Sequence, residues 1–423
     1  MQPLTKEQKR LRYACYLSNI SMAVVGNLPP LLFITFRSLY GISYSLLGLL
    51  VLINFSTQLV VDSLFSAFSK KLSVPKIVRT MPFLAIAGFI IYSASPILFG
   101  KNVYAGLVIG TVIFSAASGL AEVLVSPIVA SIPSENPDRE MSKLHSVYAW
   151  GVVAVIALST VFLFGFGSDA WQWLPIIFTS LPILAAVLFF SADVPELKSD
   201  DTSDSGTSKV IRNKRFWLCV FAIFLGGAAE CTMAQWCSGY AEKALGIEKI
   251  WGDIFGAALF GLMLGLGRTL YAKRGRSIER VLLIGAIGST ACYLTAALTS
   301  APILGLLACA TTGLCVSMLW PGCLIVVAKY FPAGGVFIYA MMAAGGDFGA
   351  SISPQLTGII TDAVAESELA ASLSQSLGIT SEQLGMKCGI LTGMVFSLVA
   401  IFIYCAMLKI EKSTADKNGD SGS

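Results

Sequence analysis

The sequence predicts an all-α membrane protein with twelve transmembrane helices in two pseudo-symmetric six-helix bundles. Three observations lead to this prediction: the composition, the spacing of apolar runs and the placement of positive charges. Of the 423 residues, 55% are hydrophobic and only 13% are charged, whereas soluble domains are about one quarter charged. So few charges could not cover a water-exposed surface. Most of the chain is therefore expected to face lipid.

Twelve apolar runs are each long enough for a helix that crosses the roughly 30 Å of membrane hydrocarbon. The expected helices cover residues 13–36, 44–68, 81–99, 103–132, 146–166, 171–192, 216–240, 250–271, 278–298, 303–328, 336–360 and 388–408. The first run follows a polar, basic start. It is too long for a signal-peptide core and lacks a small-residue cleavage site. We therefore expect it to remain in the protein as the first helix.

The positive charges indicate the topology. Cytoplasmic loops of membrane proteins carry an excess of Lys and Arg. With a cytoplasmic N-terminus, 24 of the 29 Lys and Arg residues fall on the inner side and five on the outer side. One helix more or fewer would reverse every later loop and blur this asymmetry. The pattern predicts twelve helices with both termini cytoplasmic, in the plasma membrane or a cell inner membrane.

A polar linker divides the predicted helices into two sets of six. It covers residues 193–215 and is rich in Asp, Ser, Thr and Lys, a composition typical of flexible segments. The predicted domains are an N-terminal bundle of residues 1–192 and a C-terminal bundle of residues 216–410. A disordered cytoplasmic tail is expected over residues 411–423.

The two sets share a sequence trace. Gly119 and Pro127 recur as Gly313 and Pro321, at a constant offset of 194 residues. Gly151 and Gly345, in the fifth and eleventh runs, keep the same offset. Matches in corresponding helices indicate an internal duplication, which many transporters contain.

The ten cysteines lie in or beside apolar runs and form no C-x-x-C pair. Such cysteines are typical of a helical core and not of a disulfide or zinc framework. We therefore expect no metal site. We also expect no cofactor, and we expect the protein to be a monomer.

Four carboxylates lie well inside predicted helices: Asp62, Glu122, Glu230 and Asp347. Acids inside the membrane are costly, and by default they face the bundle interior and mark a functional path. Few cations are near in the sequence. Arg268 is close to the inner end of the eighth helix, and His145, the single histidine, is at the inner mouth of the fifth. An acid that can take up a proton in mid-membrane is what proton coupling requires.

Each of these residues also has a structural interpretation. Asp62 could pair with the basic loop that follows it, and Glu122 could form a hydrogen bond between helices. Asp347 lies among glycines and could support a loosened backbone. His145 could be an ordinary histidine at the membrane interface.

Amides and two tryptophans complete the candidate lining of a polar cavity. Asn27 precedes Pro29 and Pro30, which should kink the first helix. Asn54, Gln58 and Asp62 are spaced four apart and share a helix face. Trp150 and Trp320 lie deep in their runs and could stack on a sugar ring or simply pack. The candidate substrate-binding residues are Asn27, Asn54, Gln58, Glu122, Trp150, Glu230, Gln235, Trp320 and Asp347, and the candidate proton-coupling residues are Glu122, Glu230, Asp62 and His145.

The arrangement resembles the major facilitator superfamily: twelve helices, two halves, cytoplasmic termini and a long central linker. Residues Gly119 to Pro127, followed by Leu144 to Gly151, are similar to the fucose-permease-like group of sugar:proton symporters. The resemblance implies a major facilitator fold and places Glu122 at the helix-four acid that acts in sugar binding or proton coupling.

Two positions depart from that pattern. Asn27 stands where the fucose permeases have an acid in the first helix. The superfamily signature after the second helix has Lys70 at its acidic position and Ser73 at a glycine position. The resemblance therefore implies that coupling uses other acids and that the usual latch between the halves is altered.

The sequence thus predicts a secondary active transporter, not an enzyme, that moves a small polar solute by proton-coupled alternating access. A sugar or polyol is the expected solute. The alternative is a proton-driven exporter of drugs or metabolites. A membrane-embedded enzyme or a transport-dead sensor is a further alternative, but an enzyme should have a His or Cys nucleophile or a metal cluster. A primary pump is disfavoured, because no Gly-x-x-x-x-Gly-Lys-Ser/Thr phosphate loop occurs.

Overall fold

The computed structural model describes residues 4–68, 73–134, 137–196, 210–274, 277–331 and 335–420. This part of the chain is helical and contains no strand. It divides into two compact units, Met1–Asp200 and Asp201–Ser423. The predicted bounds of the central linker stay a prediction, since residues 197–209 lie outside the described residues.

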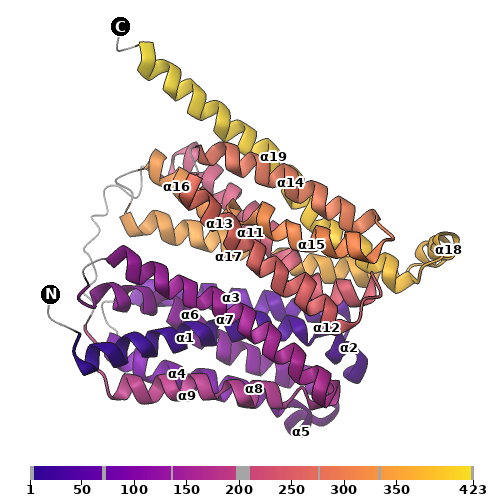
Figure 1. Ribbon diagram of the computed structural model, residues 1–423, viewed down its shortest axis with the longest axis horizontal. Helices are drawn as coiled ribbons and strands as arrows, with labels where there is room; N and C mark the ends of the chain where they lie inside the picture. Colours follow the sequence, from indigo (N-terminus) through magenta and orange to yellow (C-terminus); the bar gives the residue numbers. More distant parts are fainter. Residues whose placement is uncertain are drawn as a thin grey trace. The chain divides into compact units, whose positions relative to one another are not determined.

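The N-terminal unit runs from indigo to magenta in Figure 1. Its helices are α1 (Lys6–Leu31), α2 (Phe33–Tyr40), α3 (Tyr44–Phe68), α4 (Val74–Ser93), α5 (Ser95–Phe99), α6 (Val103–Ser131), α7 (Pro137–Phe166), α8 (Trp173–Phe178) and α9 (Ser180–Phe190), with 3-10 turns at η2 (Gly100–Asn102) and η3 (Ser168–Ala170).

The C-terminal unit follows in pink to yellow. Its helices are α11 (Lys214–Lys243), α12 (Lys249–Gly252), the π-helical turn η4 (Asp253–Ala258), α13 (Leu259–Arg274), α14 (Ile278–Leu298), α15 (Pro302–Val316), α16 (Leu319–Tyr330), α17 (Gly335–Ala365), α18 (Glu368–Leu377) and α19 (Ser381–Asp420).

Within the described residues, 10 helical segments are long and apolar enough to cross a membrane, or 11 when α1 and α2 count as one bent span. α17 corresponds to the expected helix over residues 336–360 and completes the twelve. Its 31 residues reach about 47 Å at 1.5 Å per residue, which is long enough to cross the membrane. The predicted twelve helices fit this architecture.

The predicted kink of the first helix is present. α1 and α2 meet at Leu32 with a bend of 46°. The N–H of Leu32 donates to the carbonyl groups of Pro29 and Pro30, so the backbone closes a tight turn where the two prolines supply no N–H donors of their own.

Most helix pairs of one unit have a counterpart in the other. α1 packs on α6, α7 and α9, as α11 packs on α15, α17 and α19. α4 packs on α6 and α9, as α14 packs on α15 and α19, and α3 packs on α6 as α13 packs on α15. This common pattern supports the duplication that the sequence predicts.

The repeated glycines lie at corresponding helix contacts. A Cβ atom on Gly151 of α7 would lie 3.2 Å from Ala23 of α1, and one on Gly345 of α17 would lie 2.9 Å from Val220 of α11. Such spacing lets two helices approach closely. Gly151 thus lets α7 approach α1, and Gly345 lets α17 approach α11 in the corresponding way.

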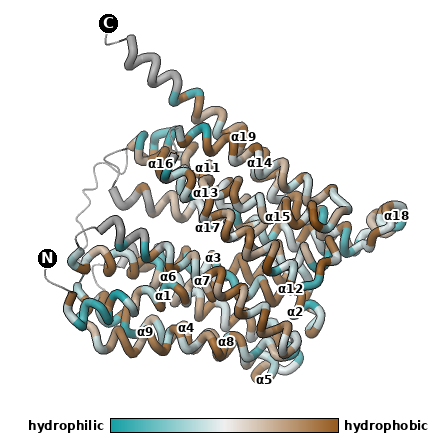
Figure 2. Tube along the Cα trace, viewed as in Figure 1, coloured by the Kyte–Doolittle hydropathy of each residue, from teal (hydrophilic) through white to brown (hydrophobic). Residues whose placement is uncertain are grey.

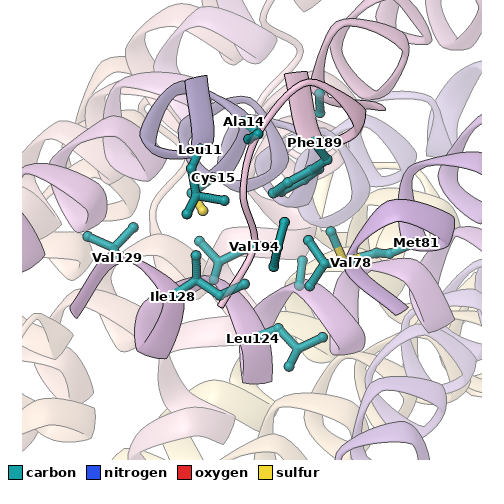
Figure 3. Close-up of a cluster of buried hydrophobic side chains, with 14 of the residues drawn as sticks. Leu11, Ala14, Cys15, Val78, Met81, Leu124, Ile128, Val129, Phe189 and Val194 are labelled. Carbon is teal, nitrogen blue, oxygen red and sulfur yellow. The ribbon is translucent and has the colours of Figure 1, made fainter. Parts of the chain in front are cut away.

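The core at one end of the N-terminal unit is purely apolar. Side chains from α1, α4, α6 and α9 point toward one another in Figure 3. The labelled residues are Leu11, Ala14, Cys15, Val78, Met81, Leu124, Ile128, Val129, Phe189 and Val194, all at most 5% exposed. This packing fixes α6, which carries Glu122, against its neighbours.

Hydrophobic residues run along most of the length of the helices in both units (Figure 2). On α7, Leu158, Val161 and Phe164 are 62%, 61% and 73% exposed. A soluble protein rarely exposes apolar surface on this scale, so these faces are the lipid-contacting surface of a membrane protein.

At the C-terminal end, α19 is helical to Asp420, and the disordered tail predicted over residues 411–423 stays a prediction. The segment from Glu411 to Lys417 contains no proline or glycine, and its Glu, Lys and Ala residues are good helix formers. The helix can therefore propagate beyond the apolar span at little cost.

Candidate functional site

Three polar side chains form a buried cluster between α3 and α6. Gln58 Nε2 donates to Asn54 Oδ1 at 3.0 Å, and Ser115 Oγ of α6 donates to the same oxygen at 2.6 Å. Asn54 and Gln58 are 7% and 8% exposed. The shared face that the sequence predicts for Asn54 and Gln58 therefore points toward α6.

Asp62 continues this face one turn later and meets α6 at Gly119. A Cβ atom on Gly119 would lie 3.1 Å from Asp62 Oδ1, so the glycine makes room for the carboxylate. Asp62 Oδ1 is buried without a hydrogen-bond partner. Glu122, three residues after Gly119, is exposed and close enough for its charge to act on Asp62.

Within the described residues, neither Asp62 nor Glu122 forms an ion pair. Arg79, a nearby cation in the sequence, instead donates to the carbonyl groups of Phe189 and Ala192. Lys70 and Lys71, the residues of the basic loop that Asp62 could reach, lie outside the described residues. If Asp62 pairs with the basic loop, as the structural interpretation holds, its partners would therefore be Lys70 or Lys71.

In the C-terminal unit, the acid Glu230 forms an ion pair. Arg268 of α13 donates from Nη2 to Glu230 Oε1 of α11 at 3.4 Å. The Glu230 side chain is 16% exposed and that of Arg268 is 46% exposed. Glu230 Oε2 is buried without a hydrogen-bond partner. The guanidinium therefore offsets the charge of the carboxylate, while Oε2 can still accept a hydrogen bond from another group.

A proline explains why Arg268 points this way. Pro321 has no N–H, so the carbonyl of Ser317, four residues earlier, has no helical partner. The helix is interrupted there, between α15 and α16. Arg268 Nε donates to that freed Ser317 carbonyl at 3.1 Å. The repeated proline of the sequence thus creates the acceptor that orients the guanidinium toward Glu230.

α11 and α17 approach closely beside this ion pair. A Cβ atom on Gly227 would lie 2.5 Å from the Gly346 carbonyl oxygen, and the ring of Trp320 covers both glycines. Asp347, next to Gly346, is 7% exposed. Asp347 and Glu230 both act electrostatically on the thiol of Cys231, so both acids lie near Cys231.

The remaining candidates are more scattered. Gln235 is buried on α11, and Asn27 Nδ2 donates to the Ala23 carbonyl of its own helix at 2.9 Å. Trp150 is 69% exposed, and its role in solute binding stays a prediction. The side chain of His145 lies outside the described residues.

A small cavity lies within the N-terminal unit, apart from the acids. It has about 20 Å³ and is lined by α1, α4, α6 and α9, including Ser18, Ser21 and Ser118. That volume holds about one water molecule. It is therefore too small for a transported solute.

Sequence reasoning missed Ser115 and the carbonyl of Ser317. Ser115 is one helical turn before Gly119, on the face that meets α3, and this spacing could have identified it. The role of Ser317 follows from its position four residues before Pro321. The pairing of Arg268 with Glu230 joins residues 38 apart, and no local pattern marks it.

Comparisons with known proteins agree with this architecture. The sequence matches the Major Facilitator Superfamily over residues 14–354. No curated protein matches the sequence.

Several solved structures share the fold. One is a bacterial homologue of the human lysosomal transporter Spinster in an inward-facing, occupied conformation, with a TM-score of 0.72, 13% identity and coverage of 96% of this chain and 98% of that chain. A variant of the nucleoside transporter NupG has a TM-score of 0.72, 14% identity and coverage of 95% and 100%. A variant of the E. coli fucose:proton symporter FucP has a TM-score of 0.56, 17% identity and coverage of 92% and 98%.

At these identities the likeness shows the fold alone, and it confirms the predicted major facilitator fold. The match to the family covers most of the chain, and the members of this family are transporters rather than enzymes. This chain therefore belongs to the Major Facilitator Superfamily and is a multi-pass membrane transporter.

Proposed function

We propose that the protein is a proton-coupled symporter of a small polar solute, a sugar or a polyol, that works by alternating access. The observation that carries the proposal is the pair of acids in the N-terminal unit. Asp62 and Glu122 lie close enough to interact, and neither forms an ion pair among the described residues.

Two neighbouring carboxylates in a low-dielectric setting repel each other when both are charged. The repulsion is relieved when one of them holds a proton, as in other paired carboxyl sites. Glu122 is the exposed member of the pair and can exchange that proton with water. Proton uptake at Glu122 would then change the charge of the unit during each transport cycle.

In each unit, the polar groups near the acids suit a neutral, hydroxyl-bearing solute. Carboxylates, amides and a half-exposed guanidinium offer both hydrogen-bond acceptors and donors. Two of the structures that share the fold are a fucose:proton symporter and a nucleoside transporter. We therefore assign Asn27, Asn54, Gln58, Trp150, Gln235, Trp320 and Asp347 to solute binding as part of the proposal, with Glu230 bound to Arg268.

The test begins with the solute. Purified protein is screened by thermal shift against sugars, polyols, amino acids and organic acids. The compound that stabilises the protein is then used for uptake into proteoliposomes, with and without an imposed inward pH gradient. We expect a sugar or polyol to stabilise the protein and the gradient to drive its accumulation. Uptake that ignores the gradient would overturn the coupling, and stabilisation only by lipophilic drugs would favour the exporter.

The same vesicles test direction and topology. We propose a plasma-membrane protein with both termini cytoplasmic that acts as a monomer and imports its solute. Protease accessibility of a C-terminal tag in right-side-out and inverted vesicles measures the orientation. Cleavage in right-side-out vesicles would contradict it.

A further inference from the structure

α18 (Glu368–Leu377) is a short helix between two long ones. Two residues, Glu366 and Ser367, connect it to α17, and three, Gly378 to Thr380, connect it to α19. In Figure 1 it lies across the ends of these two helices. Since a residue spans at most about 3.6 Å, α18 cannot move far from the membrane surface at which α17 and α19 end.

Both ends of α18 are capped. The Ser367 side chain accepts a hydrogen bond from the Ala370 N–H, and Gly378 ends the helix with φ +67° in the left-handed region. Isolated helices shorter than about 12 residues are marginal in water. The 10 residues of α18 therefore need a surface to pack on.

The protein supplies only part of that surface. Ala370 and Ser374 are 3% and 4% exposed, and Ser374 Oγ lies 3.3 Å from Ser381 Oγ of α19. A second face carries three leucines at a spacing of four residues. Leu369, Leu373 and Leu377 are 80%, 46% and 57% exposed. We name these three residues the leucine face.

We propose that α18 is an interfacial helix whose leucine face inserts into the lipid leaflet at this end of α17 and α19. A helix that lies across spanning helices is parallel to the membrane plane, as amphipathic surface helices are. Its polar side chains, among them Glu368, Ser372 and Ser376, form a face of their own that is left to water.

Charge indicates the kind of contact. Between Thr361 and Lys387 the chain carries four acidic residues and one lysine. Anionic lipid attracts basic segments, so it gives no electrostatic attraction to this acidic segment. The leucine face therefore binds through its apolar area alone and suits a zwitterionic phosphatidylcholine surface.

The experiment uses the full-length protein in phosphatidylcholine nanodiscs. A photoreactive diazirine amino acid is placed at position 369, 373 or 377, and at positions 372 and 376 as matched controls on the polar face of the same helix. After illumination, lipid adducts are measured by mass spectrometry. We expect adducts at the leucine positions to exceed those at the controls at least fivefold, and replacing half the lipid by phosphatidylglycerol to leave this ratio unchanged. Equal labelling on both faces, or cross-links to a second copy, would overturn the proposal.

A second measurement does not depend on the labelled residues. Hydrogen exchange of α18 is compared in nanodiscs for the wild-type protein, the triple variant L369Q/L373Q/L377Q and the control S372Q/S376Q. We expect the triple variant to lose amide protection in α18 alone, while the control keeps it. The leucines are exposed, so the rest of the unit should exchange as in wild type. Unchanged protection in the triple variant would show that α18 does not use the lipid.

Discussion

In the N-terminal unit, Asp62 of α3 packs against Gly119 of α6, with Glu122 nearby and no ion pair formed among the described residues. In the C-terminal unit, Glu230 of α11 has Arg268 of α13 at 3.4 Å. Most helix pairs of one unit have a counterpart in the other. α3 and α13 occupy corresponding places, yet one carries an acid and the other a base at the contact.

In the proposed symport cycle, this difference gives the two units different tasks. An acid without a cation gains most from binding a proton, so the proposal assigns proton binding to the N-terminal unit. The charge of an acid that is paired with arginine is already offset, so the proposal assigns solute binding, or positioning of the guanidinium that binds the solute, to the C-terminal unit. The duplication supplied one scaffold, and side-chain substitutions gave its copies different chemistry.

The largest effect is expected at Glu122. Replacing Glu122→Gln keeps the size of the side chain but removes the proton site, so gradient-driven accumulation of the solute in proteoliposomes should fall at least tenfold. Glu140→Gln is the control, because Glu140 lies on α7 before the membrane span that begins at Ser146. The control should accumulate solute as wild type does. Wild-type accumulation by Glu122→Gln would remove the basis for assigning coupling to the N-terminal unit.

The tightness of helix packing should also distinguish the α11–α17 pair from the α3–α6 pair. A methyl group on Gly349 of α17 would overlap the Phe224 carbonyl oxygen of α11, whereas one on Gly119 would meet its nearest atoms at 3.1 and 3.2 Å. Overpacking costs roughly 1–3 kcal/mol. Gly349→Ala should therefore lower the free energy of unfolding by about 2–3 kcal/mol, and Gly119→Ala by less than about 1 kcal/mol. Unfolding in detergent mixtures measures both, and similar losses would show that α3 and α6 are packed as tightly as α11 and α17.

The ion pair should respond asymmetrically to its two deletions. Arg268→Ala leaves Glu230 buried without a cation and frees the Ser317 carbonyl, which should cost about 2 kcal/mol. Glu230→Gln leaves a half-exposed guanidinium that water can solvate, which should cost less than about 1 kcal/mol. The double variant should be more stable than Arg268→Ala alone, because it removes the unpaired charge. Additive losses in this cycle would mean that the two side chains do not interact.

The smallest effect concerns a paired acid outside the membrane spans. A hydrogen bond from Lys143, with Arg12 nearby, lowers the pKa of Glu140. Its stabilising effect is therefore fully present above the unfolded carboxyl pKa of about 4.3 and is lost as the pH falls through the lowered folded value. The stability difference between wild type and Glu140→Gln should be under about 1 kcal/mol at pH 7 and should disappear as the pH falls below the lowered folded pKa of Glu140. A difference that grows on acidification would contradict the lowered pKa.

Much of the fold was predictable, because the membrane selects for hydropathy within each span and for charge within each loop, and both can be read from short stretches of sequence. α17 carries Asp347 among glycines, and charge placement predicted that it lies between loops on opposite sides of the membrane. The kink at Pro29 and Pro30 followed from missing N–H donors. α18 was not predicted, because its 10 residues lie in a polar loop and only its leucine spacing marks it.

The candidate site was predictable in composition but not in pairing. Asp62, Glu122, Glu230 and Asp347 stand out in any membrane span. Hydropathy places Trp150 deep in its apolar run but does not show in which direction its side chain points. Only the structure shows that Arg268 reaches Glu230, and that Ser115 satisfies Asn54.

The sequence by itself determined that this protein crosses the membrane, how its helices are ordered, and that acids lie within them, because hydropathy and charge act over one helix at a time. The tertiary structure alone decided which acid has a cation. That choice depends on distances between helices that are far apart along the chain, and on one proline that frees a carbonyl to direct an arginine.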